Sequence, residues 1–83
     1  MDKENKLLRN LNKLHTTELG IVRIKRNLSI DTDSVIEWCR NKISSDTAVI
    51  SRKGKNWYIV VDNCIFTVNA YSYTIITAHK EKK

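Results

Sequence analysis

The two histidines, His15 and His79, are the side chains best suited to acid–base chemistry in this sequence. Cleavage of an RNA phosphodiester needs a base for the 2′-hydroxyl proton, an acid for the leaving oxygen, and donors that stabilise the charged phosphate. An imidazole can serve in both proton transfers because its unperturbed pKa lies near neutral pH. A lysine and a hydroxyl would then hold the phosphate. The candidate catalytic residues are therefore His15, His79, Lys53 and Thr74.

Basic and aromatic side chains near one glycine turn supply candidate nucleic-acid contacts. Arg52, Lys53 and Lys55 surround Gly54, and such a cluster of cations attracts phosphates. Tyrosine rings can stack on bases, and a serine hydroxyl can donate to a phosphate oxygen. The candidate binding residues are Arg52, Lys55, Tyr58, Tyr71 and Ser72.

Each candidate also has a purely structural interpretation. His15 lies between two predicted helices, where it can cap or stabilise a helix end. His79 can be a solvated strand end, and the cations can belong to an ordinary soluble turn. With the two histidines, Cys39 and Cys64 make a numerical zinc set, but zinc sites use close ligand pairs, and both cysteines fall on predicted core faces. The sequence therefore predicts no metal and no cofactor.

Charge and composition favour an anionic partner. Fifteen Lys and Arg against nine Asp and Glu give a net charge of +6, and residues 48–83 hold six of the basic and two of the acidic residues. Nucleic acid, RNA above all, is the first candidate for such a partner. With 41% hydrophobic residues, the 83-residue chain is expected to fold as a single domain, 1–83. Its core is small, so a homodimer is a further expectation.

The start of the chain and its thiols predict a cytoplasmic protein. The first six residues carry four charges and lack the apolar segment of a signal peptide. The longest aliphatic run, Ile59–Val61, is far shorter than a membrane span, so no membrane partner is expected. Cys39 and Cys64 are isolated thiols, which suit a reducing compartment.

Three helices are expected to precede the strands that carry most of these candidates. Leucines at helical spacing indicate the first, and Thr16 or Thr17 can cap the second. Ser34 and Glu37 have the spacing of a capping box for the third. The predicted helices span about 3–14, 17–28 and 33–43.

From Ala48 onward the period changes from helical to alternating, which indicates β-strands. Turns at Gly54–Lys55, Asp62–Asn63 and Ala70–Tyr71 separate four such runs. Sequential strands joined by short turns form an antiparallel meander, which the helices should cover on one face to give an α+β fold. The predicted strands span about 48–52, 57–62, 64–69 and 72–79.

The three predicted hairpin registers agree on the face that should form the core. They place Ile50 opposite Ile59, and Ile59 opposite Phe66. In the third hairpin Phe66 lies opposite Ile75, and Val68 lies opposite Tyr73. A slip of one residue would scatter the apolar set, so the agreement favours the meander. The predicted core face holds Ala48, Ile50, Trp57, Ile59, Val61, Cys64, Phe66, Val68, Tyr73 and Ile75.

The opposite face of the predicted sheet mixes aliphatic, hydroxyl, amide and aromatic groups. This mixture is typical of a binding platform or a dimer face, although an ordinary solvent face of a β-rich sheet has a similar composition. Its predicted members are Val49, Ser51, Tyr58, Val60, Ile65, Thr67, Asn69, Thr74, Ile76 and Ala78.

The chain resembles a family of small, uncharacterised bacterial proteins that is common in Firmicutes. The resemblance is carried by LHTTELG (14–20), RKGKNWY (52–58) and NAYSYTIITAHK (69–80), spans about residues 14–80, and implies no activity. The order of helices and strands is also similar to the barnase, EndoU, colicin and RelE-type ribonuclease fold. That fold-level likeness implies RNA cleavage without a metal, although this chain lacks the glutamate base on the central strands of barnase.

Together these patterns predict a nucleic-acid-directed protein, RNA-binding or a metal-independent ribonuclease, that uses the open face of the sheet. One alternative is a non-catalytic module that dimerises through the same face. Another is a winged-helix-like DNA-binding protein, whose third helix would enter the major groove. That helix has a mixed outer face, with Glu37 beside Arg40 and Lys42, and four strands exceed a simple wing. The sequence identifies no partner protein or antitoxin.

Overall fold

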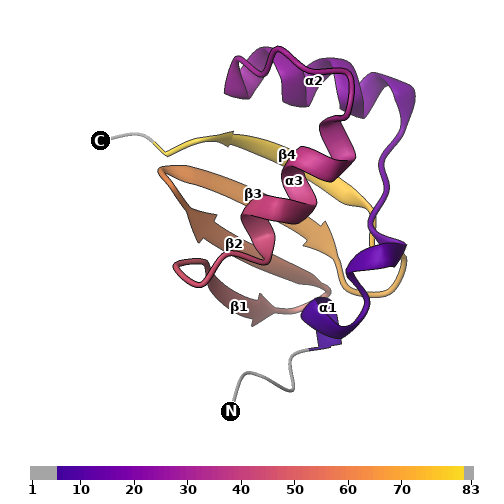
Figure 1. Cartoon of the computed structure of the whole chain (residues 1–83). Coiled ribbons are helices and arrows are strands. Elements are labelled where there is room, and N and C mark those ends of the chain that lie inside the picture. Colours follow the sequence, from indigo (N-terminus) through magenta and orange to yellow (C-terminus); the bar gives the residue numbers. More distant parts are fainter. Residues whose placement is uncertain (1–5, 82–83) are drawn as a thin grey trace.

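The computed structural model describes residues 6–81 and confirms the predicted α+β arrangement. The sheet is antiparallel with its strands in sequence order, and Figure 1 shows α3 lying across one of its faces and α2 lying along β4 at the edge. No helix among the described residues is long and apolar enough to cross a membrane. The elements are α1 (Lys6–Arg9), the 3-10 helix η2 (Leu11–Lys13), α2 (Glu18–Leu28), α3 (Val35–Ile43), β1 (Val49–Lys53), β2 (Asn56–Val61), β3 (Cys64–Asn69) and β4 (Ile75–Lys80).

The predicted first helix, about 3–14, forms only in part: residues 6–9 are α-helical and residues 11–13 are a 3-10 helix, while its first three residues lie outside the described ones. It is interrupted at Asn10, whose side-chain amide donates to the Lys6 carbonyl (Nδ2–O 2.9 Å) in place of a helical backbone N–H. The Leu11 carbonyl accepts from Arg40 Nε of α3 at 3.0 Å, a contact that ties this segment to the next layer. These side-chain bonds replace the backbone bonds of a longer helix.

The second and third helices form close to their predicted positions, but only one has the predicted cap. Thr17 precedes α2, and its hydroxyl accepts from the Gly20 N–H at 3.0 Å. Ser34 precedes α3 without a side-chain cap bond. The capping box is therefore not formed, because the Glu37 carboxylate binds Arg40 instead, at 2.8 Å.

This difference between the caps predicts a difference in stability. Thr17→Ala should lower the free energy of unfolding by about 1 kcal/mol, because it leaves an N–H of the first turn of α2 without its acceptor. Ser34→Ala is the matched control and should change it by only a few tenths of a kcal/mol, since no cap bond is lost. Urea unfolding followed by circular dichroism measures both, and equal losses would contradict the assignment.

The first two hairpins have the predicted registers. Ile50 lies opposite Ile59, and Ile59 lies opposite Phe66. Between β2 and β3, Asp62 and Asn63 have φ angles of 50° and 64°, as a type I′ turn requires of both central residues.

The predicted register of the third hairpin is wrong, since Phe66 lies opposite Ala78 and not opposite Ile75. The connection is longer than predicted because Tyr73 takes a left-handed φ of 60°, and β4 starts only at Ile75. A bulge then adds Ile76 to β4. Ala78, predicted on the open face, is consequently buried at 1% exposure, whereas Ile76 is 49% exposed.

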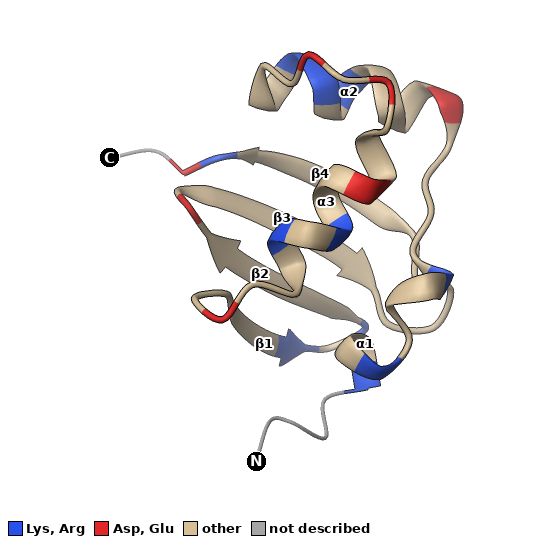
Figure 2. Ribbon diagram, viewed as in Figure 1, with Lys and Arg blue, Asp and Glu red and all other residues tan. Residues whose placement is uncertain are grey.

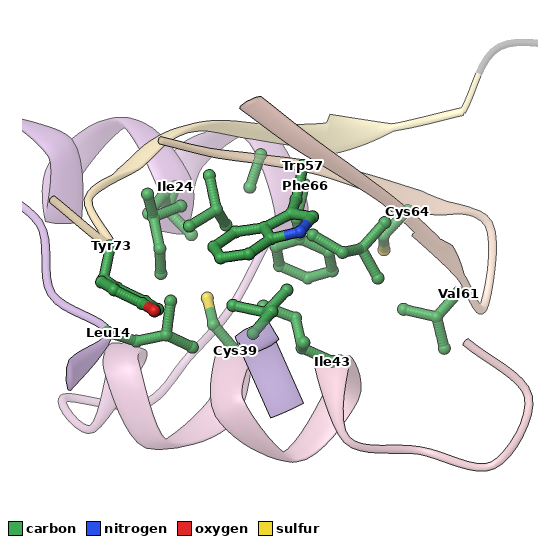
Figure 3. Close-up of a cluster of buried hydrophobic side chains, with 14 of the residues drawn as sticks. Leu14, Ile24, Cys39, Ile43, Trp57, Val61, Cys64, Phe66 and Tyr73 are labelled. Atoms are coloured by element: carbon green, nitrogen blue, oxygen red, sulfur yellow. The ribbon is translucent and has the colours of Figure 1, made fainter. Parts of the chain in front are cut away.

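The hydrophobic core fills the layer between the helices and the sheet (Figure 3). Phe66 is fully buried at its centre, with its ring centroid 6.4 Å from that of Trp38 in α3. Ala48 and Ile50 are only partly buried because they lie at the open edge of the sheet. The other predicted core-face residues are buried: Trp57, Ile59, Val61, Cys64, Phe66, Val68, Tyr73 and Ile75.

Candidate nucleic-acid interface

The loop before α2 runs beside the start of β4 and carries His15 to it. The His15 N–H donates to the Tyr73 carbonyl at 3.2 Å, and the His15 carbonyl accepts from the Ile75 N–H at 2.8 Å. These bonds form a parallel bridge between His15 and Thr74. The buried side chain of Leu14 anchors the loop on the core. Two predicted catalytic residues, 59 positions apart in the chain, are thereby brought together.

His15 ends a chain of hydroxyl groups. The Thr74 hydroxyl lies 3.0 Å from His15 Nε2, and the Ser72 hydroxyl lies 2.7 Å from that of Thr74 and 3.2 Å from Asn69 Oδ1. His15 Nδ1 lies 3.0 Å from the Lys13 carbonyl, which can only accept, so Nδ1 carries the proton. In the neutral ring Nε2 therefore accepts from the Thr74 hydroxyl, and the single Ser72 hydroxyl hydrogen is shared between Thr74 Oγ1 and Asn69 Oδ1.

Asn69 shapes the loop between β3 and β4. Its side-chain oxygen accepts from the backbone N–H groups of Tyr71 and Ser72, both at 2.9 Å. The Ala70 N–H donates to the Lys55 carbonyl at 2.8 Å, which ties this loop to the turn between β1 and β2. Tyr71 is 71% exposed, although its backbone is held by the bond from its N–H to Asn69 Oδ1.

Cations and aromatic rings meet where these two connections and the His15 loop converge. The Arg52 guanidinium lies over two rings, 5.6 Å from the centroid of Trp57 and 5.8 Å from that of Tyr71. Lys13 Nζ lies 5.5 Å from the ring centroid of Tyr73, whose ring contacts that of Trp57. We call this region the basic end and define it by Lys13, Arg52, Lys53, Lys55 and Tyr71.

The charges of the basic end are not neutralised within the described part of the chain. Over residues 6–81, no acidic side chain forms an ion pair with its four cations. Figure 2 shows basic residues of α1, of the end of β1 and of the following turn at this end, with the acidic residues among 6–81 elsewhere. By contrast, three cations of the helical layer are paired with acids: Lys25 with Asp33, Arg40 with Glu37 and Lys42 with Asp62. An anionic ligand would therefore be attracted to the basic end.

Two predicted site residues lie away from the basic end. His79 is exposed near the far end of β4, opposite Ile65 and close to the turn between β2 and β3. Tyr58 is half-buried on the open face, where it lies between Ser51 and Thr67. The two histidines therefore do not share a site. Six of the predicted residues do gather around the basic end with His15: Arg52, Lys53, Lys55, Tyr71, Ser72 and Thr74.

The cysteines offer no nucleophile. Cys39 and Cys64 are free and buried. Burial, with a smaller effect of nearby Cys64, raises the pKa of the Cys39 thiol to about 12, and burial also raises the pKa of Cys64. Both thiols are protonated at neutral pH, and the protonated form is a poor nucleophile and metal ligand. Within residues 6–81, no group of three or more His, Cys, Asp or Glu side chains is placed to hold a metal ion.

Sequence reasoning missed two residues of this region. The sequence pattern placed Asn69 only on the open face. Its side chain binds the N–H groups of the residues two and three positions later, which is a known turn signal of asparagine. Lys13 had no signal in the sequence, because its position beside Tyr73 depends on the break in the first predicted helix.

Residues 8–79 match the model of a protein family described as "Protein of unknown function (DUF3781)". The match covers most of the chain, which therefore belongs to this family. Neither the curated proteins nor the solved structures contain a match. The Firmicutes origin and the likeness to the ribonuclease fold stay predictions.

Proposed function

We propose that this chain binds single-stranded RNA through the basic end. The observation that carries the proposal is the exposed Tyr71 side chain, stacked on Arg52 at an end of the molecule whose cations no acid neutralises over residues 6–81. Such a ring can stack on an unpaired base, while the cations bind the phosphates on either side. A paired base would leave the ring without a partner, so single-stranded RNA suits this surface better than a duplex.

The hydroxyl chain extends the proposed RNA contact beside Tyr71. The Ser72 and Thr74 hydrogens are engaged within the hydroxyl chain, so their oxygens can accept a hydrogen bond from a ribose 2′-hydroxyl. Cleavage would need both an acid and a base at the scissile phosphate. His15 is the imidazole at this end, its Nε2 already binds Thr74, and His79 lies near the far end of β4. The proposal is therefore RNA binding without the cleavage step.

The two alternative functions have less support from the same contacts. In a winged-helix reading, α3 would enter the major groove, but its Arg40 and Lys42 are engaged by Glu37 and Asp62. Dimerisation through the open face would use its half-buried aliphatic side chains, such as Val60 and Ile65. Neither alternative uses the stack of Arg52 on Tyr71.

Fluorescence anisotropy with a labelled oligouridine of about 12 nucleotides tests the proposal. We expect binding at low salt that weakens steeply as salt rises, because phosphate contacts release counterions. Tyr71→Ala should weaken binding by about tenfold through the loss of one stacked base, and should leave the salt dependence almost unchanged. Tyr71→Phe is the matched control and should keep the affinity, because the ring remains.

Three outcomes would count against RNA binding at this site. The first is no binding at low salt, and the second is equal affinity of the wild type and Tyr71→Ala. The third is equal affinity for duplex RNA, because a duplex offers no unstacked base to the Tyr71 ring.

A further inference from the structure

The two edges of the sheet differ in how their backbone groups are used. At the β4 edge, the Thr16 hydroxyl donates to the Ile75 carbonyl at 3.0 Å, and the Asn27 amide donates to the Ala78 carbonyl at 3.2 Å. The Ile75 N–H is bound by the His15 carbonyl. The loop before α2 and α2 itself therefore close this edge against a further strand.

The β1 edge has no such cover among the described residues. Lys53 and Asn56 flank the two-residue turn at Gly54–Lys55 and form a hydrogen-bonded pair. Along an antiparallel ladder such pairs alternate with pairs that are not hydrogen-bonded. Ser51 and Val49 therefore bond to β2, whereas the backbone N–H and C=O groups of Ile50 and Arg52 point away from the sheet. No described residue forms a backbone bond to these outward groups, and β1 is exposed along most of its length. They are free to bond to an added strand.

A cavity lies beside this free edge, on the helix-covered side of the sheet. It has a volume of about 400 Å³ and is lined by Ala48 and Ile50 from the edge, Leu8 from α1 and Ile43 from α3, with Asp46 and two serines at its polar side. An added strand places alternate side chains on this side of the sheet. One of them can enter the cavity and bury apolar surface against these aliphatic groups.

The charge of the β1 edge indicates which kind of strand can be added to it. At its Lys53 end, β1 presents Arg52 and Lys53, and Lys55 follows in the turn, with no acidic partner among residues 6–81. Antiparallel pairing of β1 with a second copy would place Arg52 and Lys53 opposite the apolar Val49–Ile50 end of the other copy, where the cations gain no carboxylate partner. A strand with carboxylates at this position would instead add favourable charge pairs.

We propose that β1 accepts an extended, acidic segment of a partner protein by strand addition. Its backbone bonds to the outward groups of Ile50 and Arg52, one apolar side chain enters the cavity beside Ile50, and carboxylates lie against Arg52 and Lys53. This mode of recognition takes affinity from the backbone bonds, and selectivity from the cavity and the charges. The proposed strand shares Arg52 and Lys53 with the basic end, but its backbone bonds do not involve Tyr71, so the ladder can be tested separately from RNA binding.

The probe for this proposal is a fluorescein-labelled synthetic peptide of about seven residues, the length of an ordinary strand. It alternates valine and threonine, with one leucine for the cavity and two glutamates at one end. Two N-methylated versions remove the N–H groups from one edge of the peptide or from the other. Only methylation of the edge that faces β1 should abolish binding, and the version methylated on the outer edge should keep the parent affinity.

A charge reversal tests the proposed contact between the carboxylates of the partner and the two cations of β1. In Arg52→Glu/Lys53→Glu the glutamate peptide should bind at least about tenfold more weakly, and a peptide with two lysines in place of the glutamates should become the better ligand. Circular dichroism checks that the variant is folded, and the methylation test needs no variant at all.

The proposal is overturned if both methylated peptides bind alike, because affinity would then not depend on a ladder. It is also overturned if the charge reversal leaves the peptide preference unchanged. Sedimentation that shows a dimer, which the glutamate peptide dissociates, would assign the β1 edge to a second copy instead.

Discussion

Replacing Arg52, Lys53 and Lys55 together by glutamine should weaken binding of single-stranded RNA by roughly 100-fold at low salt, because each cation contributes a phosphate contact. The slope of log affinity against log salt should fall by about 2, since each lost contact with a single strand removes about 0.7. Titration of labelled oligouridine at several salt concentrations measures both quantities. The folded state should be nearly unaffected, because all three side chains are exposed.

The matched control removes the same charge from another element. Arg23→Gln/Lys25→Gln/Arg26→Gln takes three cations from α2, away from Tyr71 and the turn between β1 and β2. It should weaken RNA binding by less than about threefold, because these residues do not contact the bound strand in the proposed complex. An equal loss in both variants would mean that RNA responds to overall charge and not to the basic end.

Phe66→Ala should lower the free energy of unfolding by about 3–5 kcal/mol, because it leaves a cavity at the centre of the core. The Phe66 ring is fully buried and contacts Trp38, so the helical layer also loses a partner. For a small domain this loss is a large part of the total stability. Urea unfolding followed by tryptophan fluorescence measures it.

The next position on the same strand gives the control. Thr67→Ala, on the open face, should change the free energy of unfolding by less than about 1 kcal/mol. Phe66→Leu should recover much of the loss because leucine fills part of the space. If Phe66→Ala and Thr67→Ala were equally stable, the assignment of the two faces of β3 would be wrong.

Local patterns were sufficient for much of this fold. Turn residues with strong conformational preferences set the first two hairpin registers, as in the type I′ turn of Asp62 and Asn63. The alternation of β2 and β3 then identified their buried side chains. A helix cap at Thr17 was equally visible, because the cap bond is local.

The sequence predictions failed where a contact between distant segments overrode the local pattern. The first predicted helix is broken at Asn10, and its Leu11 carbonyl binds Arg40 of a later helix. In β4, the left-handed Tyr73 and the bulge at Ile76 shifted the register. A tyrosine rarely adopts a positive φ, so residue type gave no indication of this conformation at Tyr73. The Tyr73 ring packs on Trp57, which stabilises the conformation.

The candidate site shows the same division. The clustering of Arg52, Lys53 and Lys55 is a property of neighbouring positions, and the sequence displays it directly. The prediction that His15 and His79 act together as acid and base rested on residue type alone. Only the tertiary structure separates the two, because the strand that starts beside His15 carries His79 to its far end.

The sequence alone therefore determined the order of helices and strands, the meander, most of the core face and the local concentration of charge, because each depends on neighbouring residues and their periodicity. The tertiary structure decided which distant residues meet. It brought His15 to Thr74, joined Lys55 to the loop of Tyr71, and closed the β4 edge while leaving β1 open. These outcomes depend on contacts between segments far apart in the chain, which no local pattern encodes.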